Sequence, residues 1–383
     1  MSLPTTGVVY ACIAPHGSEV IPELAAVGAR GGGTPVGAPA AVAGPGNLET
    51  ALAKFRVLTR AMEDIGRRVR LADPDTVVLA TPHNLRLDGG YTAVVTSELV
   101  SGSLTAQAAS DQRASEGNGA AGATVRASFR CDRPLAADIV ARARKAGLPV
   151  VGVNYGALDG PNSVIPLDWG SLIPLYFIGR RSEGPEAGVT GVTMVGPWEP
   201  ALDGRGGEER PKVVLIGPGR EAPRASLVTL GRQVAEAAAA SGRRVVFVAS
   251  CDHGHAHLAA GPYGYDPASA EYDRLVCRVV GSGRLEDLVD LDPALVEAGK
   301  PDSLWQMLIL AGVLGWLAEA GRPLVGRVLA YEVPTYFGML CASYEPCPEE
   351  RPSERPSERP SERPSESRLS TSKPAGRGPR ARM

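Results

Sequence analysis

The sequence of 383 residues has five histidines, and three of them lie in the stretch ASCDHGHAH at 249–257. Asp252 precedes His253, His255 and His257, and an apolar run precedes all four residues. Imidazole binds zinc, iron, nickel and copper, and it also transfers protons near neutral pH. This pattern therefore indicates a metal site or an acid–base group, and a solvated polar loop is the alternative.

The other two histidines share one local pattern, in which an apolar run ends at proline and histidine follows. His16 lies in IAPHGSE, and His83 lies in ATPHN. All five histidines therefore follow runs that predict strands. Because ligands bind beyond the carboxyl ends of the strands in open α/β sheets, we expect the histidines to gather at one edge of a sheet.

The elements that position these residues can be read from hydrophobic patterning. Continuous apolar runs rich in β-branched residues predict strands covered on both faces, at 7–15, 76–82, 149–154, 212–218 and 244–250. Apolar residues at helical spacing predict helices at 48–69, 135–147 and 226–242. This alternation predicts an α/β fold with a mostly parallel or mixed central sheet, flanked by helices on both faces.

Composition divides the chain into a domain over 1–346 and a low-complexity tail over 347–383. The tail repeats the motif RPSE and has few bulky apolar residues, so we expect it to be disordered. Within the domain, 28–47 is rich in glycine and proline, and 101–123 is poor in bulky side chains. Both segments are expected to be insertions.

Charge and cysteine usage exclude several classes of protein. The net charge is −2 although the tail is basic, so the domain is acidic and nucleic acid is not an expected partner. The six cysteines form no CxxC pair, which fits neither a zinc ribbon nor a secreted disulfide framework. We expect no signal peptide and no membrane span, and therefore a cytoplasmic protein; Leu304–Leu317 is predicted to be a buried helix.

A metal site built on two histidines also needs an acidic ligand. Glu332, in VLAYEVPTYFGM, closes a short apolar run and is the candidate. Two imidazoles and one carboxylate form the ligand set of non-haem Fe(II) oxygenases, and catalytic zinc sites use the same set. A strand-end glutamate in water is the alternative interpretation.

Five motifs together resemble one family. APHGSE, ATPHN, LDWGSLIPLYF, VVFVASCDHGHAH and YEVPTYFGM occur in this order over residues 7–346. The set resembles the class III extradiol ring-cleavage dioxygenases of the protocatechuate 4,5-dioxygenase β-subunit type, whose fold Memo-type proteins share. The resemblance implies an Fe(II)-dependent enzyme that cleaves the aromatic ring of a catechol-like or 2-aminophenol-like substrate with O₂.

The resemblance also implies roles for individual residues. His16 and His83 match the two histidine ligands of the family, Glu332 matches the carboxylate ligand, and His255 matches the catalytic acid–base histidine. Which of His253 and His255 faces the metal stays open.

Other residues are weaker candidates for the surroundings of the metal. Asp252 can orient a histidine, with a turn-capping role as the alternative. His253, His257 and Asp168 are candidates for contact with the substrate or with the ligands, and a buried turn is an equal alternative for Asp168.

Other functions fit the same residues. One is a Memo-like metal-binding protein without ring cleavage, and another is a zinc-dependent hydrolase in which Asp252 or His255 serves as the base. A third is a scaffold protein that uses the tail for interaction. For the dioxygenase, the expected partners are a small aromatic substrate and O₂. A homo-oligomer is also compatible with the sequence, because related enzymes work as dimers or with a small second subunit.

Overall fold

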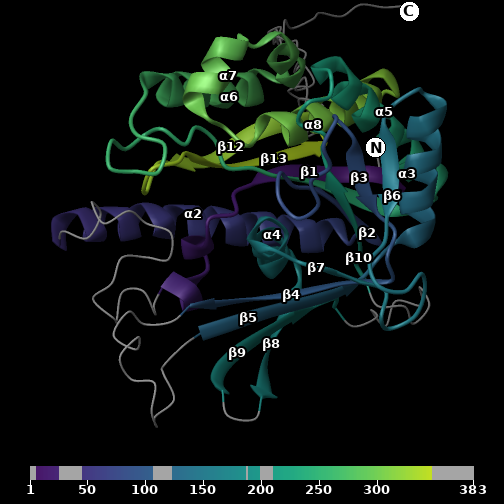
Figure 1. Cartoon of the computed structure of the whole chain (residues 1–383), viewed down its shortest axis with the longest axis horizontal. Helices are drawn as coiled ribbons and strands as arrows, with labels where there is room; N and C mark the ends of the chain where they lie inside the picture. The colour runs from purple at the N-terminus through teal and green to yellow at the C-terminus, as the bar shows by residue number, and fades with distance from the viewer. Residues whose placement is uncertain (1–5, 26–44, 107–122, 187–188, 199–209, 347–383) are drawn as a thin grey trace, which may run out of the picture. The chain divides into compact units, whose positions relative to one another are not determined.

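A computed structural model of the chain describes residues 6–25, 45–106, 123–186, 189–198 and 210–346, all of which fall within one compact unit, Met1–Cys347. Figure 1 shows its helices and strands along the chain. The elements are β1 (Gly7–Ala14), η1 (Ser18–Val20), α2 (Pro45–Ala72), β2 (Thr76–Ala80), β3 (Thr92–Val95), β4 (Leu99–Ala106), β5 (Ala123–Arg130), α3 (Arg133–Lys145), β6 (Val150–Val153), β7 (Val164–Pro166), α4 (Trp169–Ile178), β8 (Arg180–Glu186), β9 (Val189–Gly196), β10 (Lys212–Gly217), α5 (Arg224–Ala240), β11 (Arg244–Ser250), α6 (Pro267–Ser282), η4 (Leu285–Asp290), α7 (Pro293–Gly299), α8 (Leu304–Glu319), β12 (Leu324–Glu332) and β13 (Met339–Pro346).

The large sheet has eight strands in the order β12-β13-β1-β11-β2-β10-β3-β6. Its central strands β1, β11, β2 and β10 run parallel to one another. β13 pairs antiparallel with β1, and β3 pairs antiparallel with β10, so the sheet is mixed. The chain therefore leaves β1, β11 and β2 at the same edge of the sheet.

Both faces of this sheet are covered, as the continuous apolar runs predict. Along β1, Ala11 and Ile13 belong to one core with residues of α3, α5, α6 and α8. Cys12 belongs to the other core, with residues of α2, α4 and the second sheet. Successive side chains of a strand point to opposite faces, so one strand supplies both cores. Figure 1 shows α2 and α4 on the side of the large sheet that faces the second sheet.

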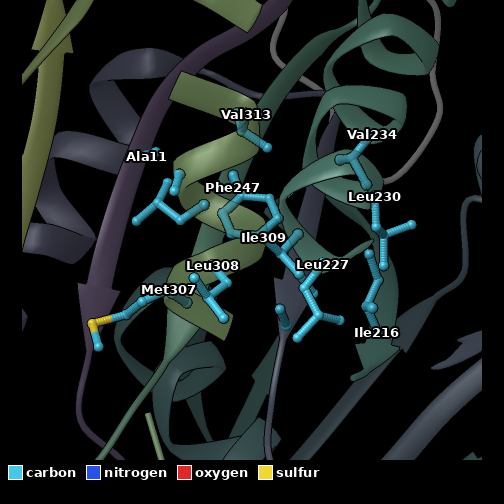
Figure 2. Packing of buried hydrophobic residues seen from close by; sticks show 14 of the residues in the cluster. Ala11, Ile216, Leu227, Leu230, Val234, Phe247, Met307, Leu308, Ile309 and Val313 are labelled. Atoms are coloured by element: carbon cyan, nitrogen blue, oxygen red, sulfur yellow. The ribbon is translucent and has the colours of Figure 1, made fainter. Parts of the chain in front are cut away.

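Helices α5 and α8 pack against each other with backbones in close approach. Figure 2 shows Leu227 and Leu230 of α5 on one side of Ile309 of α8, with the strand residue Phe247 also next to Ile309. Two glycines make this approach feasible. A Cβ on Gly231 would lie 1.9 Å from the carbonyl oxygen of Ile309, and one on Gly312 would lie 1.9 Å from that of Val228.

We expect Gly312→Ala to destabilise the fold, because the added methyl group would overlap the backbone carbonyl of Val228. This carbonyl is part of α5 and cannot move without moving the helix. Overpacking of this kind costs about 1–3 kcal/mol or more of the free energy of unfolding. Gly315→Ala is the matched control, since it lies in the same helix and nothing lies within 4 Å of its added Cβ. Urea unfolding of both variants measures the difference; equal free energies of unfolding would contradict this account of the helix contact.

A second sheet of five strands has the order β7-β4-β5-β9-β8. The sequence does not predict it, and its strand β4 overlaps the segment 101–123 that was expected to be an insertion. Residues 101–106 and Ala123 form paired strands, and the insertion itself stays a prediction. Residues 107–122 lie outside the described part of the chain.

The structure contains the strands and helices that the sequence predicts. The five predicted strands are confirmed as β1, β2, β6, β10 and β11, and the predicted helices as α2, α3, α5 and α8. The predicted insertion at 28–47 stays a prediction: α2 begins at Pro45, and 28–44 lies outside the described residues, as does the tail from 347. Within the described ranges, no helix has both the length and the apolar character that a membrane crossing requires.

Candidate metal centre

The carboxyl edge of the large sheet carries the predicted polar residues. His16 follows β1, Asp252 follows β11 and His83 follows β2, and these three strands are neighbours in the sheet. The chain therefore brings together residues that lie more than two hundred positions apart in the sequence. The expectation that strand-end histidines gather at one edge is confirmed for His16 and His83.

A third residue, Asp302, completes a group that can hold a metal ion. Ligand atoms of His16, His83 and Asp302 lie within 4.8 Å of one another. The Oδ2 atom of Asp302 lies 3.4 Å from Nε2 of His16 and 3.4 Å from Nε2 of His83. Ligands of one zinc ion at bonds of about 2.0–2.2 Å are themselves roughly 3.0–3.6 Å apart. The donor atoms therefore fit a single divalent ion.

Asp302 is held in place from two directions. Its Oδ1 atom accepts a hydrogen bond of 3.0 Å from the backbone N–H of Asp252, which leaves Oδ2 for the histidines. Asp302 also lies two residues before α8, and Gln306 in the first turn of α8 donates to the carbonyl of Ser250 at 2.9 Å. The start of α8 is therefore fastened to the end of β11.

The surroundings fix the orientation of the His16 ring. Its Nδ1 atom lies 3.0 Å from Oγ of Ser250, and this hydroxyl donates at 2.5 Å to the carbonyl oxygen of Gly170. Since the serine hydrogen is already used, the hydroxyl oxygen accepts from Nδ1–H. Nε2 is then the atom presented to Asp302, which is the tautomer that a metal ligand needs.

We expect Ser250→Ala to lower the metal affinity by about 10- to 100-fold, as the loss of an outer hydrogen-bond partner does in other metal sites. Ser343→Ala is the matched control, because its hydroxyl is also buried in a strand of the large sheet but has no hydrogen-bond partner among the described residues. Competition with a chromophoric chelator measures both affinities. Equal affinities for wild type and Ser250→Ala would contradict the orienting role.

The charges of this cluster depend on one another. Burial by itself would lower the pKa of His16, but the carboxylates of Asp252 and Asp302 outweigh burial and raise this pKa to about 9. Burial also opposes ionisation of Asp302, yet the His16 charge and hydrogen bonds from His16 and His83 hold the pKa of Asp302 well below its usual range. Without metal the cluster is therefore an imidazolium–carboxylate pair, and a metal ion that binds His16 displaces a proton.

Asp252 is a close neighbour of His16. Its Oδ1 atom accepts from the backbone N–H of His16 at 3.2 Å, and its Oδ2 atom lies 3.3 Å from Nε2. Burial and the charge of Asp302 raise the pKa of Asp252. The structure thus places Asp252 against His16, as a partner that orients a histidine.

Asp168 supports His83 from outside the cavity. It caps the N-terminus of α4 by accepting from the backbone N–H of Ser171, and its Oδ2 atom accepts from the N–H of Asn84 at 2.6 Å. The first residue of α4, Trp169, packs against His83 with ring centroids 4.6 Å apart and the ring planes tilted by 51°. Asp168 therefore ties the loop of His83 to α4, and it is not among the residues that line the cavity.

The cluster opens into a cavity of about 800 Å³. β4 supplies part of its wall through Leu104, Thr105 and Ala106, so a segment expected to be an insertion belongs to the site. Aromatic and cationic side chains form much of the remainder, namely Trp169, Tyr263, Trp305, Tyr336, Phe337, Arg86, Arg220 and Lys300. The volume and the aromatic walls suit a ligand built on an aromatic ring.

His255 lines the same cavity as the metal cluster. Its ring is stacked on Phe337, with centroids 5.4 Å apart and 17° between the planes. Its Nδ1 atom lies 2.6 Å from the carbonyl oxygen of His253. A carbonyl only accepts, so Nδ1 carries the proton, and Nε2 is left as an acceptor for a proton from a ligand.

The other two histidines of the 249–257 stretch lie outside the cavity lining. His253 is buried, its Nδ1 lies 3.0 Å from Oγ of Ser303, and burial lowers its pKa to about 4. His257 contacts the buried Asp273 through Nε2 at 2.8 Å. Asp273 also accepts from the backbone N–H of Gly254 at 2.8 Å. These contacts hold the loop that carries His255, and of the three histidines it is His255 that lines the cavity.

The assignment of Glu332 as the acidic ligand is not supported by the structure. Glu332 ends β12, where it pairs with Met339 of β13, and it belongs neither to the metal-binding group nor to the cavity lining in the described part of the chain. β12 is two strands away from β1, which is about 10 Å at the usual spacing of strands. The carboxylate that lies with His16 and His83 among the described residues is that of Asp302. The segment around Asp302, KPDSLWQ, is typical of the start of a helix. This pattern does not indicate a residue that could bind a metal.

Residues 211–338 match the family described as the catalytic LigB subunit of aromatic ring-opening dioxygenase. This match confirms the resemblance to class III extradiol dioxygenases of the LigB type. The matched segment contains Asp252, His255 and Asp302, whereas His16 and His83 precede it.

Two further proteins are similar to this chain. Protein CA_C1420 of Clostridium acetobutylicum is 23% identical over 279 residues, which are 73% of this chain and 50% of that protein. The chain thus spans about half the length of this curated relative. Among solved structures, the uncharacterized protein JW3007 from Escherichia coli K12 covers 88% of this chain with 99% of its own, at 12% identity and a TM-score of 0.42.

Proposed function

We propose that this chain is a metal-dependent extradiol dioxygenase, which opens the aromatic ring of a catechol-like or 2-aminophenol-like substrate with O₂. The observation that carries the proposal is one cavity that contains both the His16, His83 and Asp302 group and a separate histidine, His255. The LigB match over 211–338 supports the same class of reaction. We further propose iron(II) as the metal and the protocatechuate 4,5-dioxygenase β-subunit type as the nearest class.

His16, His83 and Asp302 would hold the ion. When bound, iron(II) supplies the redox and Lewis-acid chemistry that lets a substrate with two adjacent oxygens, or an oxygen and an amine, react with O₂. Both atoms of O₂ enter the ring-opened product, so no external reductant is needed. Two imidazoles and one carboxylate leave coordination positions free for the substrate and O₂.

The chain's own residues bind the ring and move protons. Phe337 and Tyr336 flank His255, so a substrate ring in this part of the cavity meets aromatic side chains next to the proton acceptor. Nε2 of His255 accepts the proton of a substrate hydroxyl and returns it when the ring opens. An imidazole suits both transfers, because its unperturbed pKa of about 6.5 lies near the working pH.

The experiment that tests the proposal compares metals on the same protein. The chain is purified without oxygen, stripped of metal, reloaded with iron(II) or zinc, and mixed with a panel of catechols and 2-aminophenols. Oxygen uptake and the yellow colour of ring-fission products are recorded. We expect uptake with iron(II) and none with zinc. Tight binding of zinc with hydrolysis of an ester panel, and no oxygen uptake with either metal, would favour the zinc-dependent hydrolase; metal binding without either activity would favour a Memo-like protein.

A further inference from the structure

The ring of His255 contacts a peptide group that an acid holds from the other side. Nδ1 of His255 lies 2.6 Å from the carbonyl oxygen of His253. The N–H of the same peptide group belongs to Gly254, and it donates at 2.8 Å to Oδ1 of Asp273. A single peptide group therefore lies between the imidazole of His255 and the carboxyl group of Asp273.

Asp273 is a buried acid within α6, and the groups around it donate hydrogen bonds. Its Oδ2 atom accepts at 2.6 Å from the hydroxyl of Tyr331 and lies 2.8 Å from Nε2 of His257. Burial raises the pKa of Tyr331, so this hydroxyl keeps the hydrogen that it donates. Within the described residues, neither a lysine nor an arginine pairs with Asp273. A buried carboxylate needs hydrogen bonds in place of water, and the N–H of Gly254 supplies one of them.

Gly338, directly before β13, fixes the peptide groups on both sides of this one. Its carbonyl oxygen accepts from the N–H of His253 at 2.8 Å, and its N–H donates to the carbonyl oxygen of Gly254 at 2.9 Å. A Cβ on Gly338 would lie 2.0 Å from Oδ2 of Asp273, so the backbone also approaches the acid closely. The peptide group between residues 253 and 254 is thus held at both ends, with its carbonyl toward His255.

We propose that Asp273 is a positioning residue for His255 and acts through the peptide group between residues 253 and 254. The carboxylate orients and polarises this group, so that its carbonyl accepts from Nδ1–H of His255. The tautomer that results leaves Nε2 free to accept a proton from the ligand. This inference rests on the proposed function in taking His255 as the acid–base group.

A carboxylate can act on an imidazole through a peptide group because the peptide group is itself polar. Hydrogen bonds to ionised acceptors are about twice as strong as neutral ones. Consecutive hydrogen bonds also polarise one another, which strengthens each of them by about 10–30%. In a Ser-His-Asp triad the aspartate fixes the tautomer of the histidine by direct contact. Asp273 fixes the same tautomer of His255 through one intervening peptide group.

The tautomer of His255 tests the proposal in the metal-free, full-length protein and needs no turnover. Nitrogen NMR of protein labelled with ¹⁵N-histidine distinguishes the two tautomers above about pH 8, where an ordinary imidazole is neutral. The chain has five histidines, and His255→Gln assigns the signals of His255. We expect the Nδ1–H form to dominate in the wild type, and its ratio to the Nε2–H form to fall about tenfold in Asp273→Asn. Dominance of the Nε2–H form in the wild type, or an unchanged ratio in folded Asp273→Asn, would overturn the proposal.

Two control variants separate this role from a general loosening of the fold. Asp266→Asn makes the same change of charge at the N-cap of α6, where Asp266 accepts from the N–H of Ala268. Tyr331→Phe removes one hydrogen bond from Oδ2 of Asp273 but leaves the bond from Gly254. Both variants should keep the tautomer ratio within about twofold of the wild type. A fall in both as large as that in Asp273→Asn would overturn the specific role of Asp273.

The wild type decides the question if Asp273→Asn fails to fold, as judged by circular dichroism. A hydrogen bond from Gly254 to a buried carboxylate predicts a strongly downfield amide proton that exchanges slowly with solvent. This resonance together with the Nδ1–H form of His255 would support the proposal. An ordinary chemical shift with fast exchange would overturn it.

Turnover distinguishes this inference from the proposed function. With iron(II) bound, Asp273→Asn should lower kcat by about tenfold or more, while KM and metal content stay within about twofold of the wild type. A tautomer ratio that needs Asp273, without oxygen uptake by the wild type on any substrate, would support the positioning role and reject the dioxygenase. Oxygen uptake with the same kcat in wild type and Asp273→Asn would reject the positioning role and keep the dioxygenase.

Discussion

Replacing Asp302 with asparagine is expected to abolish tight metal binding and with it all oxygen uptake. Asparagine keeps the volume and the oxygen that accepts from the N–H of Asp252, but it removes the negative charge next to His16 and His83. The loss should exceed the roughly 10- to 100-fold that follows removal of an outer partner, because a direct ligand is lost. Metal content after dialysis against a chelator measures the effect.

Glu332→Gln is the matched control for Asp302→Asn, since it makes the same change of charge at the end of β12. It should retain the metal content and the oxygen uptake of the wild type. The reverse result, with metal lost from Glu332→Gln and kept by Asp302→Asn, would restore the assignment made from the sequence. Thermal unfolding of both metal-free variants shows whether either one fails to fold.

Replacing His255 with alanine should leave the metal in place and lower kcat by about 10²- to 10⁴-fold, which is the usual contribution of a positioned general acid–base. Its side chain lines the cavity but does not belong to the metal-binding group. Because Nδ1 is bonded to the carbonyl of His253, Nε2 is the nitrogen whose loss is expected to lower kcat. Metal analysis together with steady-state oxygen uptake separates the two effects.

His257→Gln is the matched control, as it changes a histidine of the same loop that contacts Asp273 outside the cavity lining. We expect a lower free energy of unfolding and a kcat within a few fold of the wild type. A loss of kcat as large as that of His255→Ala would show that the loop as a whole, and not the imidazole of His255, is responsible.

Most of what could be predicted from this sequence came from the apolar runs and from the residues that follow them. The runs before His16, His83 and Asp252 are continuous and apolar because their strands are buried on both faces, and such runs are recognisable without a structure. Parallel neighbours then bring the following residues to one edge. The fold class and two of the three residues in the metal-binding group could therefore be predicted.

The acidic residue and the second sheet could not be predicted, for different physical reasons. Asp302 precedes an apolar helix, where an aspartate most often caps the first turn, and its position depends on the contact between the start of α8 and the end of β11. Strand β4 contains two serines, a threonine and a glycine, and of its residues only Val100 and Ala106 are buried. The sequence pattern of a strand with few apolar residues cannot be distinguished from that of a loop unless its partner strand, here β5, is known.

The position of β1 in the sheet determines when a metal can be bound during synthesis. Ala11 of β1 pairs with Phe247 on one side and with Tyr344 on the other, so both neighbours of this strand lie more than two hundred residues further along the chain. Pairing over such separations is slow to form, because the loop must close before its contacts stabilise it. A nascent chain that has emerged only as far as α6 contains both histidine ligands but lacks Asp302 and β13. A metal ion that needs all three residues of the group would therefore bind late, after the first and last described strands have been synthesised.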